Sequence, residues 1–293
     1  MTNDLPPVVG AGWLAAHHGE DDLLLADVRG PNAHTRGHIP GSIPLMVGTP
    51  GQFTSPDVRE AFAAEASLRL RRHGVTGEER LVLYDGGDCV SAAAALQVAE
   101  LGGHGRVSVL VGGLAGWTGE IETGVVEVEK TRAQLEPSPE AVAGLWNVVA
   151  RAEDPAVLLL DVRREDEFRG VEGYPCDRRQ GHIPGAKNVE VSTLFAAPGV
   201  PKAPEEVQAL VGVEPGATHV VTYCHSGSRS GLALIALRAA GYEATNYFGS
   251  WHEWSRHDEL PAESEERIDE WVRFGRALCG AFVTAAERIL VAA

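Results

Sequence analysis

Short apolar runs alternate with Ala-rich segments along most of the chain. The runs are rich in Leu and Val, as in LLLA at 23–26, RLVLY at 80–84 and VVTY at 220–223. Continuous apolar strands between helical segments are typical of a parallel sheet that is buried on both faces. The pattern therefore predicts an α/β fold, in which mainly parallel sheets carry helices on both faces.

The same order of segments occurs twice. The matched pairs are LLLADVRG at 23–30 with LLLDVRRE at 158–165, RGHIPGSIPL at 36–45 with QGHIPGAKNV at 180–189, and LVLYDGGDCVS at 81–91 with VVTYCHSGSRS at 220–230. Self-similarity at this scale indicates two copies of one domain. A length of 293 residues is also what two average domains require.

The repeat sets the expected domain bounds. We expect a first domain at 1–122, a charged linker at 123–138 and a second domain at 139–263. Ser138 and Pro139 have the residue types of an N-cap and a first helical turn, so a helix is predicted to open the second domain.

Beyond the second copy, residues 264–293 carry apolar side chains at helical spacing. They predict an amphipathic C-terminal helix, which packs on the chain's own surface or forms a dimer contact. We therefore expect a monomer or a weak dimer. Cys279 in this segment is interpreted as a small buried apolar residue.

Charge and composition exclude several partners. The formal net charge is −16 and Lys and Arg do not cluster, so neither nucleic acid nor an anionic membrane surface is expected to bind. No run approaches the roughly 20 apolar residues of a membrane span. The N-terminus MTNDLPPVVG lacks the features of a secretory leader, and a cytoplasmic location is expected.

The cysteines and histidines predict no metal site. Four cysteines are widely separated, without a CxxC pair or a Cys/His cluster at zinc spacing. His34 and His38 are interpreted as loop histidines that bond the backbone, because Gly and Pro flank His38. We expect neither a metal nor an organic cofactor.

The turn CHSGSR, from Cys224 to Arg229, follows a buried strand and precedes a helix. The first N–H groups of a helix lack internal partners and stabilise an anion. Gly227 lets the backbone approach that anion closely, and Arg229 adds a positive charge. This environment favours the thiolate of Cys224, which we predict to be a nucleophile. The predicted site also includes the turn residues His225, Ser226, Gly227, Ser228 and Arg229.

Local chemistry leaves two reaction classes open. Tyrosine-phosphatase-type loops also place Cys and Arg five residues apart around an anion, as Cys224 and Arg229 are. Both sulfur transfer and phosphate ester hydrolysis use a cysteine thiolate within a ring of amides. A cysteine-based phosphatase or arsenate reductase is therefore an alternative to a sulfurtransferase.

The combination of DVR, GHIPG in both copies, CHSGSR and GSWHEW at 249–254 resembles the rhodanese family in its tandem-domain form. The resemblance covers about residues 8–263. It implies an inactive first domain and a catalytic second one. Asp85 aligns with Cys224 and Val90 with Arg229, so the first copy lacks both the nucleophile and the cation.

The resemblance also implies a mechanism. A persulfide on Cys224 would carry sulfane sulfur from a small anionic donor to cyanide or a cellular thiol. Thiosulfate is the preferred donor because Arg229, with Arg178 and Arg179 before GHIPG, suits a doubly charged anion. Ser226 matches the serine of mercaptopyruvate enzymes, so 3-mercaptopyruvate is the alternative donor. A non-catalytic sulfur carrier is the third hypothesis.

Other polar residues are assigned structural roles. Asp161 with Arg163 is expected to form a buried ion pair, since the inactive copy repeats it as Asp27 with Arg29. His38, His182 and Cys89 are also interpreted as structural.

Cys176 is the exception, because it lies in the insertion GVEGYPCDRR at 170–179, which the first copy lacks. It is either an exposed loop thiol or a thiol that resolves the persulfide or forms a disulfide with Cys224.

Overall fold

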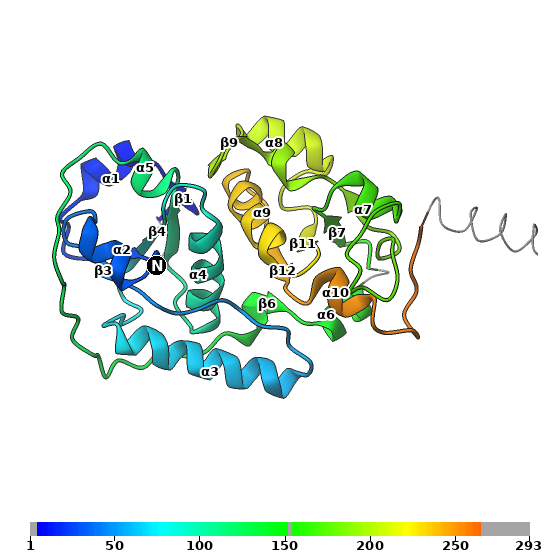
Figure 1. Ribbon diagram of the computed structural model, residues 1–293, viewed down its shortest axis with the longest axis horizontal. Coiled ribbons are helices and arrows are strands. Elements are labelled where there is room, and N and C mark those ends of the chain that lie inside the picture. The colour runs from blue at the N-terminus through cyan, green and yellow to red at the C-terminus, as the bar shows by residue number, and fades with distance from the viewer. Residues whose placement is uncertain (1–4, 152–153, 265–293) are drawn as a thin grey trace, which may run out of the picture.

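The computed structural model describes residues 5–151 and 154–264, which form two α/β units side by side (Figure 1). Each unit is built on a five-stranded sheet, and every strand pair in these two sheets is parallel. The predicted fold class is confirmed for the described residues. The predicted C-terminal helix and Cys279 fall in 265–293, outside the described residues.

The first sheet has the strand order β1-β5-β4-β2-β3. Its strands are β1 (Val8–Val9), β2 (Leu23–Asp27), β3 (Ile43–Pro44), β4 (Arg80–Tyr84) and β5 (Val107–Leu110). The central strand β4 is buried along Leu81, Val82, Leu83 and Tyr84, as its unbroken apolar run predicts. The helices around it are α1 (Ala11–His17), α2 (Pro31–Arg36), α3 (Pro56–Arg72), α4 (Val90–Leu101) and α5 (Gly113–Gly116).

The second sheet has the equivalent order β6-β12-β11-β7-β8. Its strands are β6 (Val142–Ala143), β7 (Val157–Asp161), β8 (Lys187–Asn188), β11 (His219–Tyr223) and β12 (Ala244–Tyr247). The helices are α6 (Leu145–Arg151), α7 (Glu165–Arg169), α8 (Pro204–Val211), α9 (Ser228–Ala239) and α10 (Ser250–Trp254), with a 3₁₀ turn η2 at Val191–Leu194. An antiparallel pair, β9 (Phe195–Ala197) with β10 (Val200–Pro201), is added to this unit. Among the helices of the described residues, none is long and apolar enough to cross a membrane.

The helix predicted to start at Pro139 is wrong. Pro139–Ala141 form only a 3₁₀ turn, η1, and the Ser138 side chain does not cap it. The chain then extends as β6, because Val142 and Ala143 pair with Asn246 and Tyr247 of β12 at the sheet edge. Pairing with a neighbouring strand thus overrides the local signal for a helix.

The two units meet through α4 and α9, which lie side by side between the sheets (Figure 1). The amide of Asn246 donates to Gln97 Oε1 over 2.8 Å, and both side chains are buried. Arg238 forms an ion pair with Glu100 at the other end of α4, with an Nη1 to Oε1 distance of 2.5 Å. The contact therefore combines apolar helix faces with two specific polar links.

The structural roles predicted for His34, His38 and His182 are confirmed. His34 Nε2 lies 3.0 Å from the Ser42 carbonyl, His38 Nδ1 lies 2.8 Å from the His34 carbonyl, and His182 Nδ1 lies 2.8 Å from the Phe168 carbonyl. His38 also pairs through its backbone with Glu122, and His182 pairs in the same way with Glu263. In each repeat this histidine fixes the segment that follows the repeat.

The predicted pair of Asp161 and Arg163 is also confirmed. Arg163 Nη2 lies 2.6 Å from Asp161 Oδ2, and both side chains are buried. The guanidinium lies 5.1 Å from the centre of the Trp251 ring. Asp27 and Arg29 repeat the ion pair, but the Arg29 side chain is 19% exposed.

Replacing Arg163 with Ala should lower the free energy of unfolding by about 3 to 5 kcal/mol, because it leaves a buried carboxylate without its counter-charge. Arg29→Ala should cost less, since water can reach the partly exposed site. Urea denaturation followed by circular dichroism measures both losses. Equal losses in the two variants would contradict this account of the repeated pair.

Candidate active site

Cys224 lies between the end of β11 and the start of α9, at the turn predicted from the sequence. Gly227 at the N-cap of α9 has a φ of 91°, and a Cβ there would lie 2.7 Å from Phe248. Only glycine fits this tight turn without strain. The turn brings the first amides of α9 back toward the Cys224 side chain.

Two donors point at the Cys224 sulfur. The Gly227 N–H donates to Sγ over 3.1 Å, and the Ser230 hydroxyl lies 3.4 Å from it. Ser250 Oγ accepts from the Cys224 N–H over 3.1 Å and fixes the start of the turn. The side chain is buried, so charge on this sulfur is held by protein donors rather than by water. Ser230 and Ser250 were not predicted from the sequence, since hydroxyl-bearing residues carry no distinctive spacing.

Arg229 does not present a free positive charge to the turn. Its guanidinium forms two hydrogen bonds with the Glu167 carboxylate, of 2.7 and 2.8 Å. Burial alone would raise the pKa of Glu167, but the hydrogen bonds and charge of Arg229 outweigh it and hold the pKa at about 2. Glu167 lies in α7, far from the turn in sequence, and was therefore missed. The expectation of a full cation in the cradle is replaced by a buried ion pair at its edge.

Arg179 and Arg178 also differ from expectation. Arg179 donates to the carbonyls of Trp254, Ser255, His257 and Leu260, over 2.6 to 3.3 Å. Its charge therefore fixes the segment that follows α10 instead of facing a donor. Arg178 is exposed and lies 3.3 Å from Asp258.

His225 forms one wall of the site. Its ring stacks on Tyr174 of the insertion with a centroid distance of 3.7 Å, and its Nε2 lies 3.2 Å from Asp177 Oδ1. The pKa of His225 is lowered mainly by burial, so the imidazole is neutral at pH 7. Ser226 and Ser228 are exposed at the mouth of the turn. The insertion thus lies against the turn that carries Cys224.

The first repeat fills the corresponding cradle with its own anion. Asp85 follows β4 as Cys224 follows β11, and it is buried. Its carboxylate accepts four backbone hydrogen bonds of 2.9 to 3.2 Å from Gly87, Cys89, Ser91 and Ala92. The donors that could hold a substrate anion are therefore satisfied within the domain.

Cys89 is structural, as expected. Its sulfur lies 3.4 Å from the carbonyl of Gly199, which belongs to the turn between β9 and β10 of the second unit. Burial, with a contribution from the charge of Asp85, raises the pKa of this thiol to about 12. A thiol that stays protonated at neutral pH is a poor nucleophile.

Replacing Asp85 with Ala should lower the free energy of unfolding by about 3 kcal/mol, because four buried amides lose their acceptor. Asp88→Ala is the matched control, since the Asp88 carboxylate accepts one exposed bond from Val90, and it should cost under about 1 kcal/mol. Thermal or urea denaturation of both variants decides. A negligible loss in Asp85→Ala would show that its carboxylate does not hold the turn.

Known proteins show the same architecture. The family model described as "Rhodanese-like domain" matches twice, at residues 10–120 and 147–257. The chain is 31% identical over 274 residues to the 3-mercaptopyruvate sulfurtransferase of Escherichia coli, covering 87% of this chain and 97% of the relative. It is 30% identical over 276 residues to the thiosulfate sulfurtransferase of Corynebacterium glutamicum, covering 88% and 91%.

A solved structure described as a probable thiosulfate sulfurtransferase superposes with a TM-score of 0.67 at 31% identity. The match covers 83% of this chain and 98% of that one. Two matched domains, relatives of nearly full length and a shared fold lead to one conclusion. The chain belongs to the rhodanese family, in the tandem form with two rhodanese-like domains.

Proposed function

We propose that the chain is a sulfurtransferase that moves sulfane sulfur from thiosulfate to a thiophilic acceptor through a persulfide on Cys224. One observation carries the proposal: the Cys224 sulfur accepts from Gly227 and Ser230 where the first repeat holds the Asp85 carboxylate. The family relatives named as sulfurtransferases support the reaction class. One reactive thiol per pair of repeats follows for the described residues.

The proposed reaction has two displacements. The Cys224 thiolate attacks the outer sulfur of thiosulfate, the S–S bond of thiosulfate breaks, and its electron pair leaves with sulfite. The persulfide then gives its terminal sulfur to cyanide or a thiol, and the Cys224 thiolate returns. The Gly227 amide and the Ser230 hydroxyl stabilise the charge on Cys224 before the first step and after the second. Ping-pong kinetics should follow.

The donor is the finer part of the proposal. Arg229 lies at the edge of the turn and favours a doubly charged anion such as thiosulfate. Its pairing with Glu167 reduces that preference. This pairing, with the exposed Ser226 and the similarity to a 3-mercaptopyruvate enzyme, favours 3-mercaptopyruvate as the second candidate.

The Arg229 pair argues against the phosphatase alternative. Phosphate esters require a guanidinium that can form two hydrogen bonds with phosphate oxygens. Here both terminal nitrogens of Arg229 bond the Glu167 carboxylate. A sulfur carrier without turnover would use the same persulfide and differs only in needing a partner protein as acceptor.

Thiocyanate formation from thiosulfate and cyanide tests the function directly. We expect turnover that Cys224→Ser reduces by more than about a thousandfold, because the nucleophile is lost. Cys89→Ser is the control and should retain activity. Turnover with 3-mercaptopyruvate alone would replace the donor, and hydrolysis of a phosphate ester would overturn the proposal. Activity of Cys224→Ser at the unmodified rate would also contradict it.

The double replacement of Arg229 and Glu167 by Gln tests the role of the cation without leaving a buried charge unpaired. We expect the KM for thiosulfate to rise by about tenfold, which corresponds to about 1.4 kcal/mol of lost binding. The KM for singly charged 3-mercaptopyruvate should rise less. Steady-state kinetics with both donors gives the comparison, and equal changes would remove Arg229 from donor selection.

A further inference from the structure

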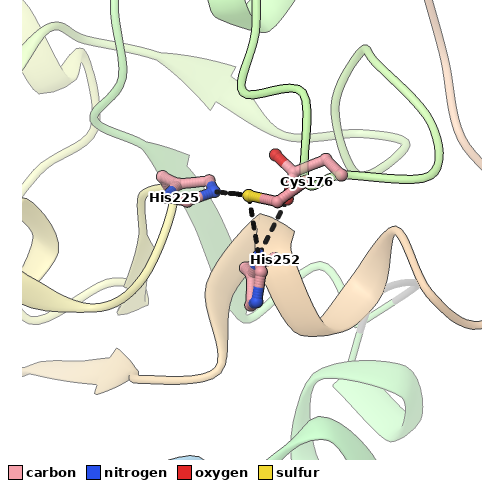
Figure 2. Close-up of side chains that lie close together, drawn as sticks. Cys176, His225 and His252 are labelled. Atoms are coloured by element: carbon pink, nitrogen blue, oxygen red, sulfur yellow. Dashed lines mark hydrogen bonds and ion pairs between the residues drawn. The ribbon is translucent and has the colours of Figure 1, made fainter.

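Four side chains capable of binding a metal meet at the mouth of the Cys224 turn. Cys176 and Asp177 come from the insertion at 170–179, His225 from the turn itself and His252 from α10. One donor atom from each lies within 4.8 Å of the others. Figure 2 shows the Cys176 sulfur pointing at the two imidazole rings.

The spacing fits a tetrahedral site. The Cys176 sulfur lies 3.8 Å from His225 Nε2, 3.8 Å from His252 Nδ1 and 3.9 Å from Asp177 Oδ1. Asp177 Oδ1 lies 2.9 Å from His252 Nδ1 and 3.2 Å from His225 Nε2. Tetrahedral Zn²⁺ with bonds of about 2.0 to 2.3 Å places its ligands about 3.3 to 3.8 Å apart. The ligand atoms need only small movements to take these positions.

We propose that Cys176, Asp177, His225 and His252 bind one Zn²⁺ ion. One thiolate, one carboxylate and two neutral imidazoles balance the charge of a divalent ion, and thiolate with imidazole selects a zinc-like metal over Mg²⁺ or Ca²⁺. Binding forms a bond from Zn²⁺ to the Cys176 sulfur and releases the thiol proton to solvent. No electrons are transferred.

The residues around the cluster hold it in place. The Asp177 side chain is 1% exposed, so its carboxylate is fixed between the two imidazoles. Arg256 donates to the His252 carbonyl over 2.5 Å and to the Cys176 carbonyl over 3.3 Å, which ties two ligand-bearing segments together. Tyr174 stacks on the His225 ring. Ligands with such outer support are preorganised.

The site would link the insertion to catalysis by position. His225 directly follows Cys224, and its backbone carbonyl accepts from the N–H of His252 over 2.9 Å. A metal ion here joins the insertion, the turn and α10 at one point. The first repeat lacks the insertion, and this site gives the ten added residues a purpose. The expectation of no metal site rested on sequence spacing, which cannot detect ligands from three distant segments.

Metal titration of the full chain tests the proposal without any turnover, so its outcome is independent of the proposed function. The protein is stripped with EDTA, kept reduced with a phosphine, and titrated with Zn²⁺ by calorimetry and with Co²⁺ by absorption. We expect one Zn²⁺ per chain, and Co²⁺ spectra with tetrahedral d–d bands and a thiolate charge-transfer band. Cys176→Ser should abolish the charge-transfer band and weaken Zn²⁺ binding by at least about a hundredfold, as should His252→Gln for affinity.

Two control variants separate this site from other thiols and imidazoles. Cys224→Ser removes the neighbouring thiol, and His257→Gln removes an exposed imidazole that pairs with Glu259. Both should bind Zn²⁺ as the unmodified chain does. Unchanged binding in Cys176→Ser, a charge-transfer band lost in Cys224→Ser instead, or no binding by the unmodified chain would overturn the proposal. Circular dichroism of each variant confirms that it is folded before titration.

Discussion

The structure depends on one constraint, the need to supply an anion to the backbone amides where the central strand of each sheet turns into a helix. Those amides have no partners within the helix and are buried, so they must be satisfied by an acceptor. In the first repeat the acceptor is the Asp85 carboxylate, which takes four of them. In the second repeat the Cys224 sulfur takes the same place and accepts from Gly227. The same fold is therefore self-satisfied in one copy and available for chemistry in the other.

The two copies have consequently taken on different tasks. The first offers a docking surface: Cys89 contacts Gly199 of the second unit, and Gln97 of α4 bonds Asn246. The second carries the insertion at 170–179, which lies against the turn through His225. The Arg229 charge is balanced by Glu167, so the amides and the Ser230 hydroxyl do most to stabilise the sulfur.

The sequence predicted what depends on local pattern. Unbroken apolar runs predicted the parallel sheets, the repeat predicted the duplicated fold, and Asp161 with Arg163 was recognised because Asp27 and Arg29 repeat it. Partners brought together by loops were missed: Glu167 lies on α7, and Asp177 and His252 belong to different segments. The role of Arg179 was misjudged because a guanidinium near a site can equally bind the carbonyls of a passing segment. The helix at Pro139 failed because edge-strand pairing is a tertiary effect.

The most direct test of the central claim is the mass of the protein after reaction with thiosulfate in the absence of an acceptor. The account predicts a gain of about 32 Da, one sulfur atom, that maps to the peptide containing Cys224 and disappears when cyanide is added. It also predicts no gain on the Cys89 peptide, because that thiol stays protonated and buried. A gain on Cys89 or Cys176 in place of Cys224, or none with either sulfur donor, would contradict it.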